Sequence, residues 1–136
     1  MYETFEHTAD LGIRVRAANL DELFADAARG LFSVMVANLD AVRAIESVGI
    51  QLRGENLDEL FHDWLAELLF HFHADRKVLA DFHVQVAPPN LTAAARGETI
   101  DLGRHRIDME VKAITWHGLR VQQQPEGWLA EAIVDI

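Results

Sequence analysis

The sequence predicts a single α+β domain in which two main helices pack on a mixed or antiparallel β-sheet. Three observations lead to this prediction. A strand–helix unit occurs twice, the second half of the chain has the two-residue alternation of β-strands, and a length of 136 residues suits one domain. Half of the residues are hydrophobic and a quarter are charged, as in ordinary globular proteins. We therefore expect one domain over residues 1–136.

The repeated unit appears when residues 12–26 are aligned with residues 49–63, at an offset of 37. Ten of the fifteen aligned residues are identical, since GIRVRAANLDELFAD matches GIQLRGENLDELFHD. In each copy an alternating apolar stretch is followed by Asn and, three residues later, by Glu, a pattern typical of a strand that leads into a capped helix. Asn19 and Asn56 are the predicted N-caps of the two helices.

Strand-like alternation dominates the second half. Apolar residues alternate over residues 82–86 and again over residues 109–115, so both segments are predicted strands. The sequence QPEG at residues 124–127 suits a tight turn. It predicts a hairpin between residues 119–123 and residues 128–136, so that the chain ends inside a strand.

Two short motifs in this half have ordinary structural interpretations. Gly97-Glu98 indicates a turn. Arg104, His105 and Arg106 form a small basic patch, which we expect in a solvated loop, with contact to RNA or phosphate as the alternative. No glycine-rich phosphate-binding loop is found in the sequence.

Composition restricts the classes of function. Twenty-two acidic against twelve basic residues give a net charge of −10, which repels phosphate backbones, so we expect no independent binding to nucleic acid. The absence of cysteine excludes disulfides and thiolate metal sites. Charges interrupt every apolar run, and the first residues lack the features of a secretory signal. These observations predict a cytoplasmic protein without a membrane span.

The residues before each copy differ. At the repeat offset of 37, Asp10 before the first copy corresponds to Ser47 before the second, and His7 corresponds to Ala44. The strand–helix unit itself therefore does not require an acid or a histidine at these positions. A specific role is one interpretation. The other is a capping or turn-forming Asp beside a surface histidine.

The chain closes on Val134-Asp135-Ile136, without a polar tail after a strand pattern. If this end is held in a hairpin, the α-carboxylate of Ile136 lies beside the Asp135 side chain. With Asp10 nearby, three carboxylates share one place and repel one another unless protons or a cation neutralise them. Oxygen ligands favour hard ions, with Ca²⁺ first and Mg²⁺ or Mn²⁺ as alternatives. The competing interpretation is an exposed Asp at a frayed terminus.

Several segments together resemble one known family. EHTADLGIRV opens the chain, DELFHDWLAELL lies in the second predicted helix, VKAITWHGL follows in the strand-rich half, and WLAEAIVDI closes it. In this order and at these separations the segments resemble the archease family over nearly the whole chain. The resemblance implies an archease-like domain over residues 1–136.

The resemblance also implies a function. Archeases are cofactor proteins of RtcB-type RNA ligases, which join RNA ends in tRNA splicing and processing, and they are activators rather than enzymes. They promote GTP-dependent guanylylation of the ligase and its multiple turnover. By position, the resemblance implies a divalent metal site, typically calcium, formed by Asp10, Asp135 and the carboxylate of Ile136. Apart from the resemblance, His7 is a candidate to donate to a ligand carboxylate or to contact the partner, and the alternative is a hydrogen-bonded structural histidine.

Two other classes of function remain as alternatives. A metal-dependent hydrolase, such as a phosphoesterase, would use Asp10 and Asp135 with a histidine base, but the sequence offers few further ligands and no evident pair of nucleophile and base. A chaperone-like interaction module would bind a protein and hold its cation incidentally. Phosphodiester turnover by the chain alone would indicate the hydrolase. Acceleration of ligase guanylylation that survives replacement of both Asp10 and Asp135 by Ala would indicate the interaction module.

Overall fold

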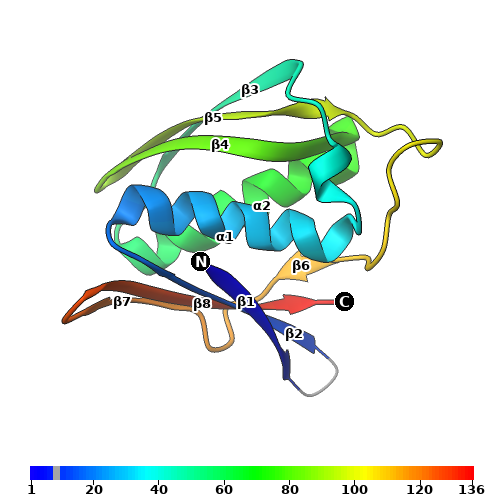
Figure 1. Cartoon of the computed structure of the whole chain (residues 1–136). Coiled ribbons are helices and arrows are strands. Elements are labelled where there is room, and N and C mark those ends of the chain that lie inside the picture. The colour runs from blue at the N-terminus through cyan, green and yellow to red at the C-terminus, as the bar shows by residue number, and fades with distance from the viewer. Residues whose placement is uncertain (8–9) are drawn as a thin grey trace.

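Two antiparallel sheets enclose a pair of helices in the computed structural model, which describes residues 1–7 and 10–136, the side chain of His7 excepted (Figure 1). The helices form the middle layer and contact strands of both sheets. This arrangement confirms the predicted α+β class. The helices are α1 (Leu20–Met35) and α2 (Leu57–Asp75), with a short 3₁₀ turn at Leu39–Ala41. The larger sheet contains β1 (Tyr2–His7), β2 (Asp10–Ala17), β6 (Ala113–Ile114), β7 (Arg120–Gln124) and β8 (Gly127–Asp135). The smaller sheet contains β3 (Glu46–Arg53), β4 (Lys77–Ala87) and β5 (Asn90–Thr99).

Both helices begin where the sequence predicts. The side chain of Asn19 accepts a hydrogen bond of 2.9 Å from the backbone N–H of Glu22, and Asn56 accepts one of the same length from Glu59. Each bond satisfies one of the backbone donors that a helix start leaves without an intrahelical partner. Within the described part of the chain, no helix combines the length and apolarity needed to cross a lipid bilayer.

The second strand–helix unit is inserted into the first. β3 and α2 are followed directly by the β4–β5 hairpin, and the smaller sheet has the order β3-β5-β4. β2 and α1 are completed by the β7–β8 hairpin, which comes only after the whole second unit. β8 then pairs with β2 as β5 pairs with β3. Both sheets therefore repeat one arrangement, in which the strand of the unit pairs with the second strand of a hairpin.

Equivalent aspartates at the two helix starts bind each helix to the sheet that contains the other unit's strand. The Asp21 carboxylate in α1 accepts a 2.8 Å hydrogen bond from the backbone N–H of Val86 in β4. The Asp58 carboxylate in α2 accepts a 2.8 Å bond from the N–H of Val121 in β7. Because these aspartates occupy the same place in the two copies, the repeat also fixes how the sheets are held on the helix layer.

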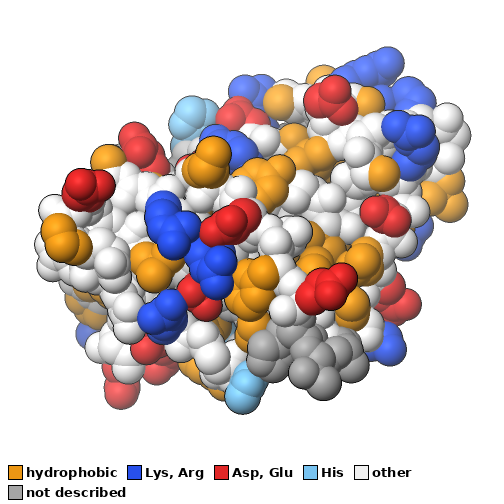
Figure 2. Space-filling model, turned by 60° about the horizontal axis from the view of Figure 1, so that its bottom comes forward, with side chains coloured by type: hydrophobic (Ala, Val, Ile, Leu, Met, Phe, Trp, Pro, Cys, Tyr) orange, Lys and Arg blue, Asp and Glu red, His pale blue; other side chains and the backbone are white. Residues whose placement is uncertain are grey.

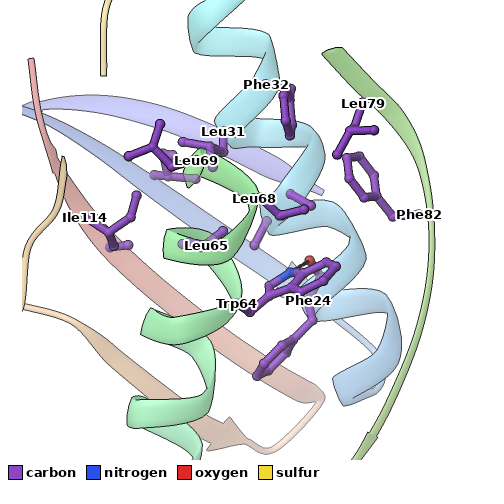
Figure 3. Packing of buried hydrophobic residues seen from close by; sticks show 14 of the residues in the cluster. Phe24, Leu31, Phe32, Trp64, Leu65, Leu68, Leu69, Leu79, Phe82 and Ile114 are labelled. Carbon is purple, nitrogen blue, oxygen red and sulfur yellow. Dashed lines mark hydrogen bonds between the residues drawn. The ribbon is translucent and has the colours of Figure 1, made fainter. Parts of the chain in front are cut away.

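Aromatic side chains from both copies meet in the core between the sheets (Figure 3). Phe24 and Phe61, which occupy the same place in the repeat, contact edge to face with ring centroids 5.2 Å apart. The indole N–H of Trp64 donates a 2.9 Å hydrogen bond to the carbonyl of Phe24, so this buried ring has its polar atom satisfied. The duplicated pattern thus provides both halves of one continuous core.

The segment before β6 departs from the prediction. Residues 109–115 were expected to form a strand, whereas the structure has only the two residues of β6 there. The preceding backbone is bound to helices instead, because the Asp108 N–H donates to Met35 at the end of α1 and the His73 ring in α2 donates to the Val111 carbonyl. Of the alternating apolar residues only Val111 is fully buried, while Met109 is 37% exposed and strand pairing is confined to two residues.

A buried ion cluster replaces the turn and the solvated patch that the sequence suggested. Glu98 lies in β5, and Glu98 and His105 are only 4% and 2% exposed. The Glu98 carboxylate accepts hydrogen bonds from the backbone N–H of Arg43, from the Arg104 guanidinium and from His105 Nε2. His105 Nδ1 accepts from the Asp101 N–H, so Nε2 is the donor to Glu98. The cluster ties the loop after β5 to the 3₁₀ turn.

Glycines at equivalent places in the two copies have different surroundings. A Cβ atom added to Gly12 in β2 would lie 2.1 Å from the ring of Phe5 in β1, whereas one added to Gly49 in β3 would meet nothing within 4 Å. The Phe5 ring also carries the Arg14 guanidinium 4.5 Å from its centroid. Only the first copy therefore needs glycine, because an aromatic ring lies against its backbone.

We predict that Gly12→Ala destabilises the protein by about 1–3 kcal/mol, since the Phe5 ring has to move and overpacking costs this much. The matched change Gly49→Ala should shift the free energy of unfolding by less than about 0.5 kcal/mol. Urea denaturation of both variants measures the difference. Equal destabilisation of the two would contradict the assigned role of Phe5.

We also predict that Glu98 makes stability depend on pH. Its N–H bond from Arg43, then its bonds from Arg104 and His105, lower the pKa of Glu98 from 4.5 to about 2. A depressed pKa means that the ionised group stabilises the fold above pH 4.5 and loses this effect as the pH falls toward 2. Glu98→Gln should be less stable at neutral pH and should lose less stability over that range.

The measurement is urea unfolding at a series of pH values for wild type, Glu98→Gln and Glu55→Gln. Glu55 is an exposed control outside any described ion pair. Parallel stability curves for wild type and Glu98→Gln would show that Glu98 does not contribute to the acid transition.

Candidate functional site

The two ends of the chain meet in the larger sheet through β8. One edge of β8 pairs with β2, and its other edge pairs with β7 and then with β6. The register places Asp10, the first residue of β2, directly opposite Asp135, the last residue of β8. Ala113 of β6 lies opposite Asp135 on its other side. Residues far apart in the sequence therefore form one row across the end of the sheet.

Asp10 and Asp135 are placed so that their carboxylates share one face of the sheet. Side chains directly opposite each other on antiparallel strands point the same way, with Cβ atoms about 4.5–5.5 Å apart. Ile13 and Val15 in β2 are fully buried against the helices, so Asp10 points to the other face, away from the core. Both aspartates are half-buried. Two like charges in this position destabilise the pair unless something neutralises them.

The last residue is held close to this pair. The Ile136 side chain packs against the hydrophobic core, and the backbone N–H of Lys112 donates a 2.7 Å hydrogen bond to the Asp135 carbonyl. β8 is thus paired on both edges up to its last residue. Ile136 follows Asp135 directly, so the predicted α-carboxylate of Ile136 would be the third carboxylate at this end of the sheet.

His7 lies on the neighbouring strand. Its backbone is opposite Asp10 in the β1–β2 pairing, so the row runs from β1 through β2 and β8 to β6. Its side chain, and Thr8 and Ala9 between the two strands, lie outside the described residues. The proposed role of His7 beside a ligand or a partner stays a prediction.

The duplication provides an internal comparison for the acidic pair. Ser47 in β3 occupies the place of Asp10 in β2, and the residue opposite Ser47 is Arg96 in β5. The equivalent pairs are therefore acid with acid in the larger sheet and serine with arginine in the smaller sheet. Because the second copy folds with serine and arginine there, the strand pairing does not demand two opposed acids.

These oxygens are suitable ligands for a hard cation. Two carboxylate side chains and an α-carboxylate are the donor types that Ca²⁺ and Mg²⁺ prefer, and water commonly completes their coordination. Among the described residues, no group of three His, Cys, Asp or Glu side chains is arranged to hold a metal. A cation here would therefore depend on the chain terminus as its third protein ligand, and Asp10, Asp135 and Ile136 as ligands stay a prediction.

The row of His7, Asp10, Asp135 and Ala113 is here called the acidic row, and the next row along these strands is apolar. Phe5, Gly12 and Ile133 lie opposite one another on β1, β2 and β8, and the Phe5 ring covers Gly12. Ile133 is only 4% exposed although it points away from the helices, because the segment between β6 and β7 approaches it at Gly118. This row separates the acidic end from the charged centre of the sheet.

A ladder of alternating charges crosses the centre of the same face (Figure 2). Glu3, Arg14, Glu131 and Arg120 lie opposite one another on four neighbouring strands. Arg14 Nε lies 3.0 Å and Arg120 Nη2 2.6 Å from Glu131 Oε1, and Arg14 Nη1 lies 3.3 Å from Glu3 Oε1. Burial opposes the ionisation of Glu131, but hydrogen bonds from Arg120 and Arg14 outweigh it and lower the pKa of Glu131.

The sequence reasoning missed this ladder and the buried Glu98 cluster. For the ladder, a single sequence offers only the alternation of side chains along each strand, which shows which residues share a face of the sheet. Which strands lie side by side, and in which register, depends on pairings between distant segments. The ladder neutralises the arginines of this face internally and leaves the acidic row as its unusual feature.

Known proteins resemble this chain along its whole length. The sequence model of the archease protein family matches residues 2–136. A protein archease from Methanopyrus kandleri is 39% identical over 139 residues, which cover 99% of this chain and 99% of the relative. A protein archease from Pyrococcus abyssi is 37% identical over 140 residues, covering 99% of this chain and 98% of the relative.

Solved structures share the fold. The solution structure of a Methanobacterium thermoautotrophicum protein matches with a TM-score of 0.85 at 33% identity, covering 99% of this chain and 98% of that one. A crystal structure from Thermotoga maritima, described as an archease and possible chaperone, matches with a TM-score of 0.65 at 16% identity, covering 100% of this chain and 98% of that one. At this identity the second likeness concerns the fold alone.

Proposed function

The chain belongs to the archease family, and on that premise we propose that it is an activator of an RtcB-type RNA ligase in tRNA splicing. It promotes the GTP-dependent guanylylation of the ligase and its multiple turnover without being an enzyme itself. The observation that carries this proposal is the acidic row at the meeting point of the two chain ends. That row lies at the end of the larger sheet, and both of its aspartates are partly exposed.

A divalent cation is part of the proposal. Asp10, Asp135 and the α-carboxylate of Ile136 bind it, with Ca²⁺ favoured over Mg²⁺ or Mn²⁺ because irregular, water-completed carboxylate coordination suits the larger ion. Two opposed carboxylates that the fold does not require support this assignment. His7, whose backbone lies opposite Asp10, supports a ligand or contacts the ligase.

Within this proposal, the cation held by the acidic row contributes positive charge near the nucleotide phosphates of the ligase. Nucleotidyl transfer depends on neutralising the charge that develops on phosphate oxygens and on aligning the attacking group. A cation held at a sheet end could provide part of that charge in the nucleotide pocket of the partner. The remaining role of this chain is to hold the carboxylates rigidly, through the pairing of β8 on both edges.

We predict that Asp10→Ser, which installs the residue of the second copy, weakens Ca²⁺ binding about tenfold or more, because affinity follows the number of charged ligands. Glu55→Ser, at an exposed acid away from the site, is the matched control and should bind Ca²⁺ as wild type does. Two glycines appended after Ile136 should weaken binding similarly, because they convert the α-carboxylate into an amide.

Isothermal titration calorimetry with CaCl₂ measures these affinities. An extension at Met1 is the control for the added glycines, since Met1 pairs with Arg16 at the opposite end of the β1–β2 hairpin. If the C-terminal and N-terminal extensions bind Ca²⁺ equally, Ile136 is not a ligand.

We further predict that the wild-type protein accelerates guanylylation of its cognate ligase by GTP, while Asp10→Ser and Asp135→Asn largely lose this effect. The measurement is incorporation of radiolabelled GMP into the ligase over time, with Glu55→Ser as the control. Acceleration that survives both aspartate changes would favour a chaperone-like interaction module. Hydrolysis of phosphodiesters by the chain alone would favour a metal-dependent hydrolase.

A further inference from the structure

Two large aromatic side chains are exposed beside helix α2. Phe70 is 56% exposed and Trp116, in the segment after β6, is 57% exposed. Neither position is explained by the core or by the acidic row. Phe and Trp are enriched at protein–protein interfaces relative to the rest of the surface.

Trp116 is held in a fixed orientation. Its ring stacks on the His62 ring, with centroids 3.8 Å apart and planes inclined by 12°. His62 is itself fixed, because Nε2 donates a 3.1 Å hydrogen bond to the Ile114 carbonyl and Nδ1 lies 3.0 Å from the Asp63 carboxylate. An aromatic residue already ordered in the free protein loses little conformational entropy on binding.

Phe70 belongs to a continuous face of α2. Asp63, Ala66, Glu67 and Phe70 have the spacing i, i+3, i+4 and i+7, which places them on one side of a helix. The side chains of Asp63 and Glu67 are each 40% exposed. With Trp116 stacked at the Asp63 end, this face, here called the α2 strip, has an aromatic residue at each end and carboxylates between them.

The α2 strip adjoins the acidic row through β6. Ala113 lies opposite Asp135, Ile114 lies opposite Val134, and the chain then runs directly to Trp116. Two residues separate Trp116 from Ala113, so three steps along an extended chain span about 10 Å. The α2 strip and the acidic row are therefore linked by one short strand.

We propose that the α2 strip is the docking surface for the ligase, which meets it with an apolar socket for Trp116 and Phe70 bordered by Lys or Arg side chains. This inference rests on the proposed function. Charge complementarity supports the basic border, because the strip carries two exposed carboxylates and the chain has a net charge of −10. Tryptophan is among the residue types that most often contribute a large share of the binding energy at an interface.

Binding of the purified cognate ligase, measured by biolayer interferometry, tests the proposal. Trp116→Ala and Phe70→Ser should each weaken binding about tenfold or more, because each removes a large aromatic contact. Glu67→Lys should slow association and reduce its dependence on salt. Ile45→Ala removes an apolar residue that is 71% exposed and lies just before β3, and it should leave the affinity unchanged.

Three outcomes separate this inference from the proposed function. Wild-type affinity for Trp116→Ala and Phe70→Ser, with guanylylation still lost in Asp10→Ser, would overturn the docking surface and leave the activator function standing. No binding of the ligase by the wild-type protein would overturn both. Weakened binding in the strip variants, with unchanged Ca²⁺ affinity and thermal stability, would support the surface, and Trp116→Phe, which keeps a ring over His62, should then recover part of the affinity.

Discussion

The pairing of β8 with β2 is the contact on which both the larger sheet and the candidate site depend. β8 is the only described strand that joins β2 to β6 and β7, and without it the larger sheet would separate into unconnected pieces. The same pairing sets Asp10 against Asp135 and fixes Ile136 beside them. A single register therefore determines the integrity of the sheet and the position of its acidic row.

The internal duplication separates features of the fold from features of function. Phe24 and Phe61 both pack in the core, and the two N-cap asparagines both cap a helix, so these residues belong to the fold. Gly12 and Asp10 do not have equivalent surroundings in the second copy. Both special residues of the first copy lie on the outer face of β2, which indicates that this face, rather than the core, has diverged.

Local patterns in the sequence predicted much of the fold. The strand–helix units, the helix starts at Asn19 and Asn56 and the β7–β8 hairpin follow from periodicity, capping and turn residues within short segments. The juxtaposition of Asp10 and Asp135 was an expectation from the two ends of the sequence, and the structure places them in register. Their role as ligands stays a prediction.

What the sequence did not predict depends on distant contacts. The buried pair Glu98 and His105 has the residue types of a surface loop, and only the surrounding donors make burial possible. The backbone around Val111 follows the two helices because His73 and the end of α1 bind it, which no alternation of apolar residues can indicate. The ladder centred on Glu131 needs a register across four strands.

The insertion of one unit into the other has a consequence for biosynthesis. β3, α2, β4 and β5 are consecutive in the chain, so the smaller sheet can assemble while synthesis continues. β8, in contrast, is separated from its partner β2 by the whole of the second unit. The larger sheet can therefore close only after the inserted unit and β8 have been synthesised, and until then β2 and the inner side of α1 offer an unpaired edge and an apolar face to chaperones.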